Sequence, residues 1–286
     1  MSDQPLFDRA PFHSIDLRGQ VALVTGGGRG LGREMASHLA AAGAAVAVVA
    51  RSAAEIEETV AQIKDTGGRA VSLVADVTDA AAVDRAFDAA ERAIGPLDLV
   101  VNNAGHGGDP GPVWELDPAA WWRTQEVNVL GTFLGTRAAL ARMVPRRRGR
   151  VVNVSSRAGN VGIQYASAYA TSKTAVTRLT EIAAADARPH GVSVFAIEPG
   201  TVLTTMTRQL LASDAGRRWL PWYRDIFDTG RDATPEEGAR LVVRLASGAA
   251  DALSGRFISR ADDLDALVRD ADSIARDERL VLRLRA

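Results

Sequence analysis

The chain has 286 residues, of which 47% are hydrophobic and 24% charged, a composition typical of a globular protein large enough to bury a sizeable core. Its formal net charge of −1 offers no field that would attract nucleic acid or an acidic membrane surface. The chain lacks cysteine and its four histidines are scattered, so we expect no disulfide, no thiol chemistry and no metal site. One basic run after Pro145, at residues 146–150, is interpreted as a solvated loop.

The N-terminal residues 1–12 contain acids and prolines without an apolar stretch, which argues against a secretion signal. The longest apolar run, from Leu39 to Ala50, is interrupted by Gly43 and is too short to cross a bilayer. We therefore expect a cytoplasmic protein with no membrane partner.

From Gln20 onward, short Val-rich runs alternate with segments of helical length. The runs are continuous rather than alternating, as in strands that are buried on both faces. This rhythm predicts one doubly wound α/β domain, a parallel sheet of about seven strands with helices on both faces. The predicted strands are 21–25, 45–50, 70–75, 97–103, 150–155, 192–198 and a weaker 255–259, and the predicted helices are 31–42, 53–66, 79–94, 118–144 and 168–188.

No low-complexity linker divides the chain, so we expect an arm at 1–19, one catalytic domain at 20–260 and a charged tail at 261–286. The rhythm lapses between residues 204 and 235, where four aromatic residues gather. This region is either an insertion over a pocket or a buried patch. The four are Trp219, Trp222, Tyr223 and Phe227.

The first predicted strand runs into "TGGGRGLG", residues 25–32, and then into a predicted helix. Glycines let a backbone approach a pyrophosphate, and the start of the helix offers free N–H groups and a positive dipole. Gly26, Gly30 and Gly32 follow the pattern T-G-x-x-x-G-x-G. In this strand–turn–helix context the glycines predict a nucleotide site of the Rossmann type rather than a flexible loop.

Tyr169 and Lys173 form an unusual pair in a chain that has only three tyrosines and two lysines. On a helix their side chains would lie one turn apart on the same face. An ammonium beside a phenol favours the phenolate, and lysine provides this as a compact point charge. The alternative is an ordinary surface pair. Tyr165 has Tyr169 rather than a lysine four residues later, so we expect it to line the pocket or to pack.

Four further motifs occur in order: "DVTD" at 76–79, "NNAG" at 102–105, "VN" at 127–128 and "PG" at 199–200. Together with the glycine turn, they make residues 18–260 resemble the short-chain dehydrogenase/reductase family. The resemblance implies a Rossmann-type fold, a nicotinamide cofactor and a small carbonyl or alcohol substrate.

The resemblance also implies the roles of single residues. The family's catalytic serine lies thirteen residues before its tyrosine, which selects Ser156 rather than Ser155 to polarise the substrate oxygen. Tyr169 would exchange the proton, Lys173 would tune Tyr169 and bind ribose, and Asn128 would hold a water that relays protons. The expected cofactor contacts are Gly26, Gly28, Arg29, Gly30, Leu31, Arg51, Ser52, Asp76, Val77, Asn103, Ala104, Gly105, Tyr169, Lys173, Pro199, Gly200, Val202 and Thr204.

The end of the second predicted strand bears on the choice of cofactor. NAD-preferring enzymes place an acid there to bind the ribose 2′-hydroxyl, but this chain has Ala50 followed by Arg51. A guanidinium can hold a 2′-phosphate with charge-assisted bonds. We therefore expect NADP(H) to be preferred over NAD(H), unless Arg51 merely points to solvent.

For the substrate pocket we expect His106, Tyr165, Trp219 and Trp222, with the aromatic region as a lid over a largely apolar substrate. The same aromatic residues could instead form an oligomer contact. The tail departs from the family's usual ending, and it would cover either its own active site or a neighbouring subunit. A homo-oligomer, tetramer or dimer, remains the expectation.

Three functions are compatible with this pattern. The first is interconversion of a ketone and a secondary alcohol. The second is epimerisation or dehydration through a transient keto intermediate, with the cofactor retained and not consumed. The third is a non-catalytic, nucleotide-sensing protein, against which the intact serine, tyrosine and lysine argue because sensing needs no proton donor.

Overall fold

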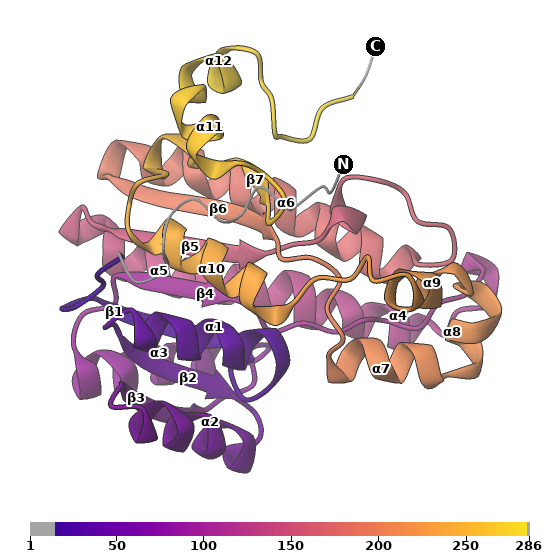
Figure 1. Ribbon diagram of the computed structural model, residues 1–286, viewed down its shortest axis with the longest axis horizontal. Coiled ribbons are helices and arrows are strands. Elements are labelled where there is room, and N and C mark those ends of the chain that lie inside the picture. The colour runs from indigo at the N-terminus through magenta and orange to yellow at the C-terminus, as the bar shows by residue number, and fades with distance from the viewer. Residues whose placement is uncertain (1–14, 285–286) are drawn as a thin grey trace.

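The computed structural model of the protein describes residues 15–284 (Figure 1). Most of the predicted N-terminal arm, residues 1–14, lies outside the described residues. Its last part is held to the domain, because Leu17 is buried and its N–H donates to the Ala42 carbonyl at 2.7 Å.

Seven parallel strands form one sheet in the order β3-β2-β1-β4-β5-β6-β7. The predicted α/β fold with a doubly wound parallel sheet is confirmed. The order reverses between β1 and β4, and ligands of such sheets bind outside the carboxyl ends of the strands at that point. The strands are β1 Val21–Thr25, β2 Ala45–Ala50, β3 Arg69–Val74, β4 Leu99–Asn102, β5 Gly149–Val154, β6 Val192–Glu198 and β7 Phe257–Ser259.

Helices cover both faces of the sheet, and each layer has its own apolar core. On one face, Met35 and Ile56 pack against the sheet together with Val242. On the other face, Phe87 and Met143 do the same. The first layer comprises α1 Gly30–Ala41, α2 Ala53–Asp65 and α10 Pro235–Ala246, and the second comprises α3 Ala80–Ile94, α5 Gly131–Arg146 and α6 Ser167–Ala187.

The predicted helix at 118–144 is three consecutive segments. An α-helix, α4 Pro118–Gln125, runs into a π-helical segment, Glu126–Leu130, which continues into α5. Single π turns inside α-helices often occur at functional sites, and this one contains Asn128.

The expected solvated loop at 146–150 is shorter than predicted. Pro145 and Arg146 lie in the last turn of α5, and Arg147, with φ of 52°, and Arg148 form the exposed turn before β5. Arg146 donates to the Leu97 carbonyl at 2.6 Å, and Arg150 pairs with Asp251. The run is therefore divided among a helix end, a short exposed turn and a strand.

The segment after β6 folds into three short helices at one end of the sheet, α7 Thr205–Ala212, α8 Asp214–Trp219 and α9 Trp222–Asp228 (Figure 1). Residues 204–235, where the alternation of predicted strands and helices lapses, therefore form mainly helices. We call these three helices the lid segment.

The tail forms two short helices, α11 Leu264–Arg269 and α12 Ala271–Arg276, on the side of the sheet where β7 lies. The Leu280 carbonyl accepts from Phe257 N–H at 2.9 Å, and Arg283 pairs with Glu181 of α6. The tail therefore covers the β7 edge of its own chain and not the lid segment.

Among the helices of residues 15–284, none has the length and apolar character needed to cross a membrane. The same part of the chain contains no group of three or more acidic or histidine side chains that could hold a metal ion.

Candidate active site

The glycine turn is closely packed. Gly26 and Gly30 have φ of 65° and 55°, a region that disfavours side chains. A Cβ added to Gly32 would lie 2.2 Å from the Gly26 carbonyl oxygen, and one on Gly26 would lie 2.9 Å from the Ala104 Cα. The Gly28 carbonyl accepts from Arg33 at 2.6 Å. This cradle fits the phosphates of a dinucleotide, because only glycine leaves the backbone accessible there.

The "NNAG" segment is tied to the end of β1. The Thr25 hydroxyl accepts from Asn103 N–H at 3.0 Å and from Ala104 N–H at 3.1 Å. The Asn103 amide donates back to the Thr25 carbonyl at 2.9 Å. These bonds hold the carboxyl ends of β1 and β4 together at the switch point.

Asp76 follows β3, which lies two strands from β1 in the sheet. Burial opposes its ionisation, yet hydrogen bonds from the Thr78 N–H and hydroxyl lower the pKa of Asp76 below its ordinary value. Arg51 and Arg123 approach its carboxylate at 3.9 and 3.6 Å. Arg123 is not among the predicted cofactor contacts, because it lies in none of the sequence motifs that predicted them. The neighbouring Val77 is buried against α5.

Two other predicted cofactor residues already have protein partners. Arg29 pairs with Glu55 at 3.1 Å, and Ser52 caps α2 by accepting from Glu55 N–H. Leu31 packs against the apolar core beneath the first layer of helices. The Arg29 charge is thus partly neutralised, while Arg51 keeps a side chain that is 68% exposed.

Lys173 lies at the centre of the site, with 5% of its surface exposed. Its ammonium donates to the Val154 carbonyl at 2.8 Å and lies 5.7 Å from the centre of the Tyr169 ring. A Cβ on Gly105 would lie 3.8 Å from the same nitrogen. Burial lowers the pKa of Lys173 to about 8. The helix therefore places the pair on one face, as the spacing predicts.

The pKa of Tyr169 differs from the expectation. Burial raises the pKa of the phenol above its ordinary value, and the hydrogen bond from Ser156 only partly opposes this. The Glu198 charge also raises it. Desolvation of the phenolate is the largest of these effects, so Tyr169 is a protonated phenol at neutral pH.

The two serines at the end of β5 have different surroundings. The Ser155 hydroxyl is buried between the Lys173 carbonyl at 3.1 Å and the Thr177 hydroxyl at 2.8 Å. The Ser156 oxygen is half-buried, accepts from Ala158 N–H and hydrogen-bonds Tyr169. Of the two, Ser156 is the one that reaches the phenol.

Asn128 is fully buried and its side chain is occupied by protein atoms. Its oxygen accepts from His106 N–H at 2.7 Å, and its amide donates to the His106 carbonyl and the Ser172 hydroxyl, both at 2.9 Å. The side chain thus braces the segment after "NNAG" against α6. The expected water relay stays a prediction.

The turn after β6 carries the chain back toward the glycine turn. Gly200 has φ of 93°, and a Cβ there would lie 2.3 Å from the Ala233 Cβ. Pro199 packs against Gly238, and Val202 is buried. Thr204 caps α7 and would lie 3.3 Å from a Cβ on Gly30, so it faces the phosphate cradle.

The predicted pocket residues are only partly brought together. Tyr165 has φ of 66°, accepts from Gly111 N–H at 2.8 Å and packs its ring 4.8 Å from that of Trp219. His106 lies beside Asn128 at the mouth of the site, and its ring accepts from Gly108 N–H. Trp222, on α9, is 44% exposed, and its ring is edge-on to that of Tyr223 at 5.6 Å.

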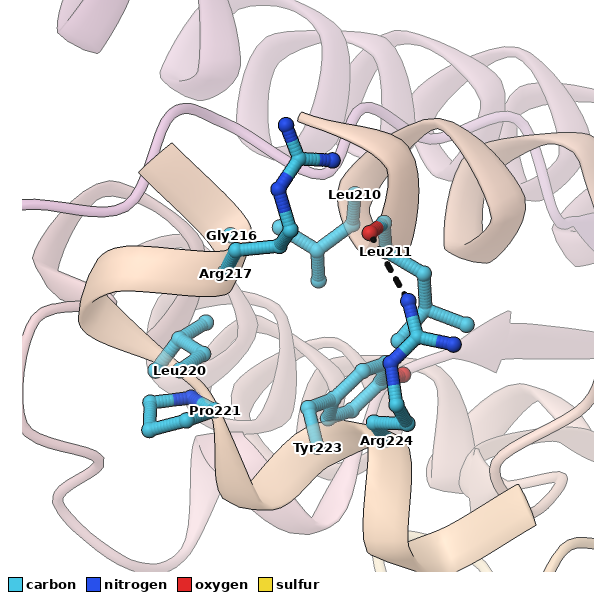
Figure 2. Close-up of a pocket in the computed structure, with 8 residues that line it drawn as sticks. All are labelled: Leu210, Leu211, Gly216, Arg217, Leu220, Pro221, Tyr223 and Arg224. Atoms are coloured by element: carbon cyan, nitrogen blue, oxygen red, sulfur yellow. Dashed lines mark hydrogen bonds between the residues drawn. The ribbon is translucent and has the colours of Figure 1, made fainter. Parts of the chain in front are cut away.

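Tyr223 is the more buried of these two neighbours, and it lines a cavity between the three helices of the lid segment (Figure 2). Burial raises the pKa of its phenol, and the neighbouring Tyr169 raises it further, while a hydrogen bond with Thr201 opposes the shift. Its ring is edge-on to Phe227 at 5.8 Å. The aromatic cluster indicated a lid, but nothing in the sequence distinguished Tyr223 from its neighbour Trp222.

The model of the short chain dehydrogenase family matches residues 20–215. The chain belongs to this family. The curated relatives include 2-(S)-hydroxypropyl-CoM dehydrogenase 3 of Xanthobacter autotrophicus, 42% identical over 240 residues that cover 84% of this chain and 94% of the relative. Galactitol 2-dehydrogenase of Rhizobium johnstonii is 39% identical, and the match covers 85% of this chain and 94% of that relative.

Solved structures agree with this family. A Beutenbergia cavernae protein assigned as an NAD(P)-dependent gluconate 5-dehydrogenase, solved with NADP at low occupancy, superposes with a TM-score of 0.77. It is 33% identical, and the match covers 88% of this chain and 97% of that one. The protein is thus a short-chain dehydrogenase/reductase, an oxidoreductase acting on alcohol and carbonyl groups with a nicotinamide cofactor.

Proposed function

We propose that the protein interconverts a ketone and a secondary alcohol with NADP(H), and that Tyr169 exchanges the proton. The observation that carries the proposal is the buried Lys173 ammonium, fixed to the Val154 carbonyl beside the Tyr169 ring. Burying a cation costs free energy, and such perturbed groups are common at functional sites. Here the neighbour of the cation is a phenol that also hydrogen-bonds Ser156.

The nicotinamide, when bound, supplies or accepts the hydride. Ser156 holds the substrate oxygen with its hydroxyl. Tyr169 is protonated at neutral pH, which suits it to donate to that oxygen during reduction. Lys173 remains mainly cationic below a pKa of about 8, so its charge stabilises the phenolate that remains.

The preference for NADP(H) is supported by the end of β2. Ala50 presents no carboxylate, and the exposed Arg51 is held only loosely by Asp76, at 3.9 Å. A 2′-phosphate would gain a charge-assisted bond of roughly 1.5–3 kcal/mol there. Arg29 contributes less, because Glu55 already pairs with it.

The test is kcat/KM with NADPH and NADH, in the wild type and in the double variant Ala50→Asp, Arg51→Ala. We expect the wild type to favour NADPH and the variant to reverse the order. Equal or better efficiency of the wild type with NADH would refute the preference. Substrate conversion without net change in the cofactor would point instead to epimerisation or dehydration.

An exposed apolar face supports the expected homo-oligomer. Trp122 on α4, Leu130 at the end of the π-helical segment and Phe133 on α5 are 59%, 40% and 45% exposed. Large exposed apolar patches commonly mark protein contacts. Sedimentation velocity of the wild type and of Phe133→Glu tests whether this face joins subunits.

A further inference from the structure

The carbonyl of Gly28, in the middle of the glycine turn, is held by side chains from two helices. Gly28 is buried, and its oxygen accepts from the Nε and Nη2 atoms of Arg33 at 3.0 and 2.6 Å. The hydroxyl of Thr59, on α2, donates to the same oxygen at 3.3 Å. A buried carbonyl needs one partner, and here a single guanidinium supplies two charge-assisted bonds. The direction of the Gly28 carbonyl is therefore fixed.

The Arg33 guanidinium is itself fixed by Glu58. Its Nη1 and Nη2 atoms donate to the two carboxylate oxygens of Glu58 at 3.0 and 2.9 Å, and the Arg33 side chain is 25% exposed. The guanidinium thus joins α1, which carries Arg33, to α2, which carries Glu58. Because Glu58 already pairs with this charge, the contact with Gly28 is the one through which Arg33 acts on the glycine turn.

The direction of the Gly28 carbonyl determines the direction of the Arg29 N–H. The peptide bond between the two residues is trans, since residues 15–284 contain no cis peptide bond, and a planar trans peptide points its N–H opposite to its C=O. The carbonyl faces Arg33 and Thr59, so the Arg29 N–H faces away from both. Arg29 is exposed and is the N-cap of α1. Its N–H therefore directly precedes the free N–H groups of the first helical turn.

We propose that Arg33 is a positioning residue for the nicotinamide cofactor: it holds the Gly28–Arg29 peptide so that the Arg29 N–H is available to the pyrophosphate. A bond from a cation to the carbonyl also polarises the peptide, which strengthens its N–H as a donor. The inference rests on the proposed binding of the pyrophosphate at the glycine turn. It does not depend on the choice between NADP(H) and NAD(H), because both carry the same pyrophosphate.

Cofactor binding without turnover tests this role. Kd is measured for NADPH and NADH by fluorescence titration, and for adenosine 2′-monophosphate, which lacks the pyrophosphate, by calorimetry. In Arg33→Met we expect the Kd values for NADPH and NADH to rise by the same factor, at least about fivefold, and the Kd for adenosine 2′-monophosphate to stay unchanged. A role in stability alone would leave all of these Kd values unchanged at a temperature where the variant is folded.

Arg137→Met is the matched control. Arg137 pairs with Asp84 and so also joins two helices, α5 and α3, but these cover the other face of the sheet. We expect it to bind both cofactors like the wild type. Arg33→Lys keeps the charge but replaces the planar fork with a single ammonium, which cannot reproduce the paired bonds to Gly28 and Glu58. It should raise both Kd values by at least about twofold, and it keeps the proposal testable if Arg33→Met does not fold.

Wild-type affinity for NADPH and NADH in either Arg33 variant would overturn the proposal. So would a rise for NADPH alone, which would assign Arg33 to the 2′-phosphate, or an equal rise for adenosine 2′-monophosphate, which would indicate loosening of the whole site. Gly32→Ala separates the proposal from its premise. If Gly32→Ala loses cofactor affinity while Arg33→Met retains it, the turn binds the pyrophosphate but Arg33 does not position it. If Gly32→Ala retains wild-type affinity, the turn is not the cofactor site and the proposal fails with it.

Discussion

The Lys173 ammonium donates a 2.8 Å hydrogen bond to the Val154 carbonyl, so the end of β5 fixes the position of a cation borne by α6. Both groups are buried, and the ammonium has exchanged water for this carbonyl and a position over the Tyr169 ring, 5.7 Å from its centre. Burial of such a charge opposes folding, and the proposed function gives it a role beside Tyr169.

The first prediction is that Lys173→Met is more stable than the wild type at pH 7 but inactive. Burial lowers the pKa of Lys173 from 10.5 to about 8, which corresponds to a cost on the order of 3 kcal/mol for holding the charge. Loss of the bond to Val154 offsets part of the gain, which leaves roughly 1–2 kcal/mol. Denaturant unfolding measures the difference.

The lowered pKa of Lys173 sets how the stability difference between Lys173→Met and the wild type depends on pH. The cost is fully present below pH 8 and disappears as the pH rises toward 10.5, where lysine is neutral in the folded and unfolded states alike. The stability advantage of Lys173→Met should shrink across this window. An advantage that is constant or grows with pH would contradict the assignment. Lys173→Arg should also be severely impaired, because the larger planar group does not fit the buried position.

The second prediction concerns Asn128. Asn128→Ala removes the hydrogen-bond partner of the His106 N–H and of the His106 carbonyl, and leaves the Ser172 hydroxyl with only its bond to the Tyr169 carbonyl, which should cost roughly 2–4 kcal/mol of unfolding free energy. Asn160→Ala is the control, since Asn160 is exposed. A stability loss no larger than that of the control would mean that the side chain is not a brace, and would favour a purely catalytic role.

The third prediction tests the phosphate cradle. Gly32→Ala would place a Cβ 2.2 Å from the Gly26 carbonyl oxygen, so the turn must shift. We expect the Kd for NADPH, measured by fluorescence titration, to rise at least about tenfold because the backbone no longer approaches the phosphates. Gly162→Ala meets no atom within 4 Å and serves as the control. Wild-type affinity in Gly32→Ala would exclude this turn from the cofactor site.

Much of the sheet could be predicted because its strands are continuous valine-rich runs. Residues 21–25, 45–50 and 192–198 were predicted with the boundaries that the structure has. The fourth strand was predicted too long, at 97–103, because hydrophobicity does not reveal that Asn103 turns away to bond Thr25. Likewise, the apolar pattern of 118–144 gives no sign of the π-helical segment, which depends on hydrogen-bond register and not on composition.

Features that depend on tertiary packing could not be predicted in this way. The sequence shows Trp222 and Tyr223 as adjacent aromatic residues, but the packing of α9 decides which of the two side chains is more buried. Desolvation raises the pKa of Tyr169, a consequence of burial that the spacing from Lys173 does not reveal. The contact of the tail with β7 joins Leu280 to Phe257, residues that no motif links.

The central claim is that Tyr169 exchanges the proton in a reaction that consumes the nicotinamide cofactor. The most direct measurement is NADPH oxidation against a panel of ketones by the wild type, Tyr169→Phe and Tyr165→Phe, with NADPH affinity measured in parallel. We expect the wild type to consume NADPH in proportion to the ketone reduced, Tyr169→Phe to lose nearly all turnover with little change in NADPH affinity, and Tyr165→Phe to retain turnover. Substantial turnover by Tyr169→Phe, or its loss in Tyr165→Phe alone, would contradict the claim.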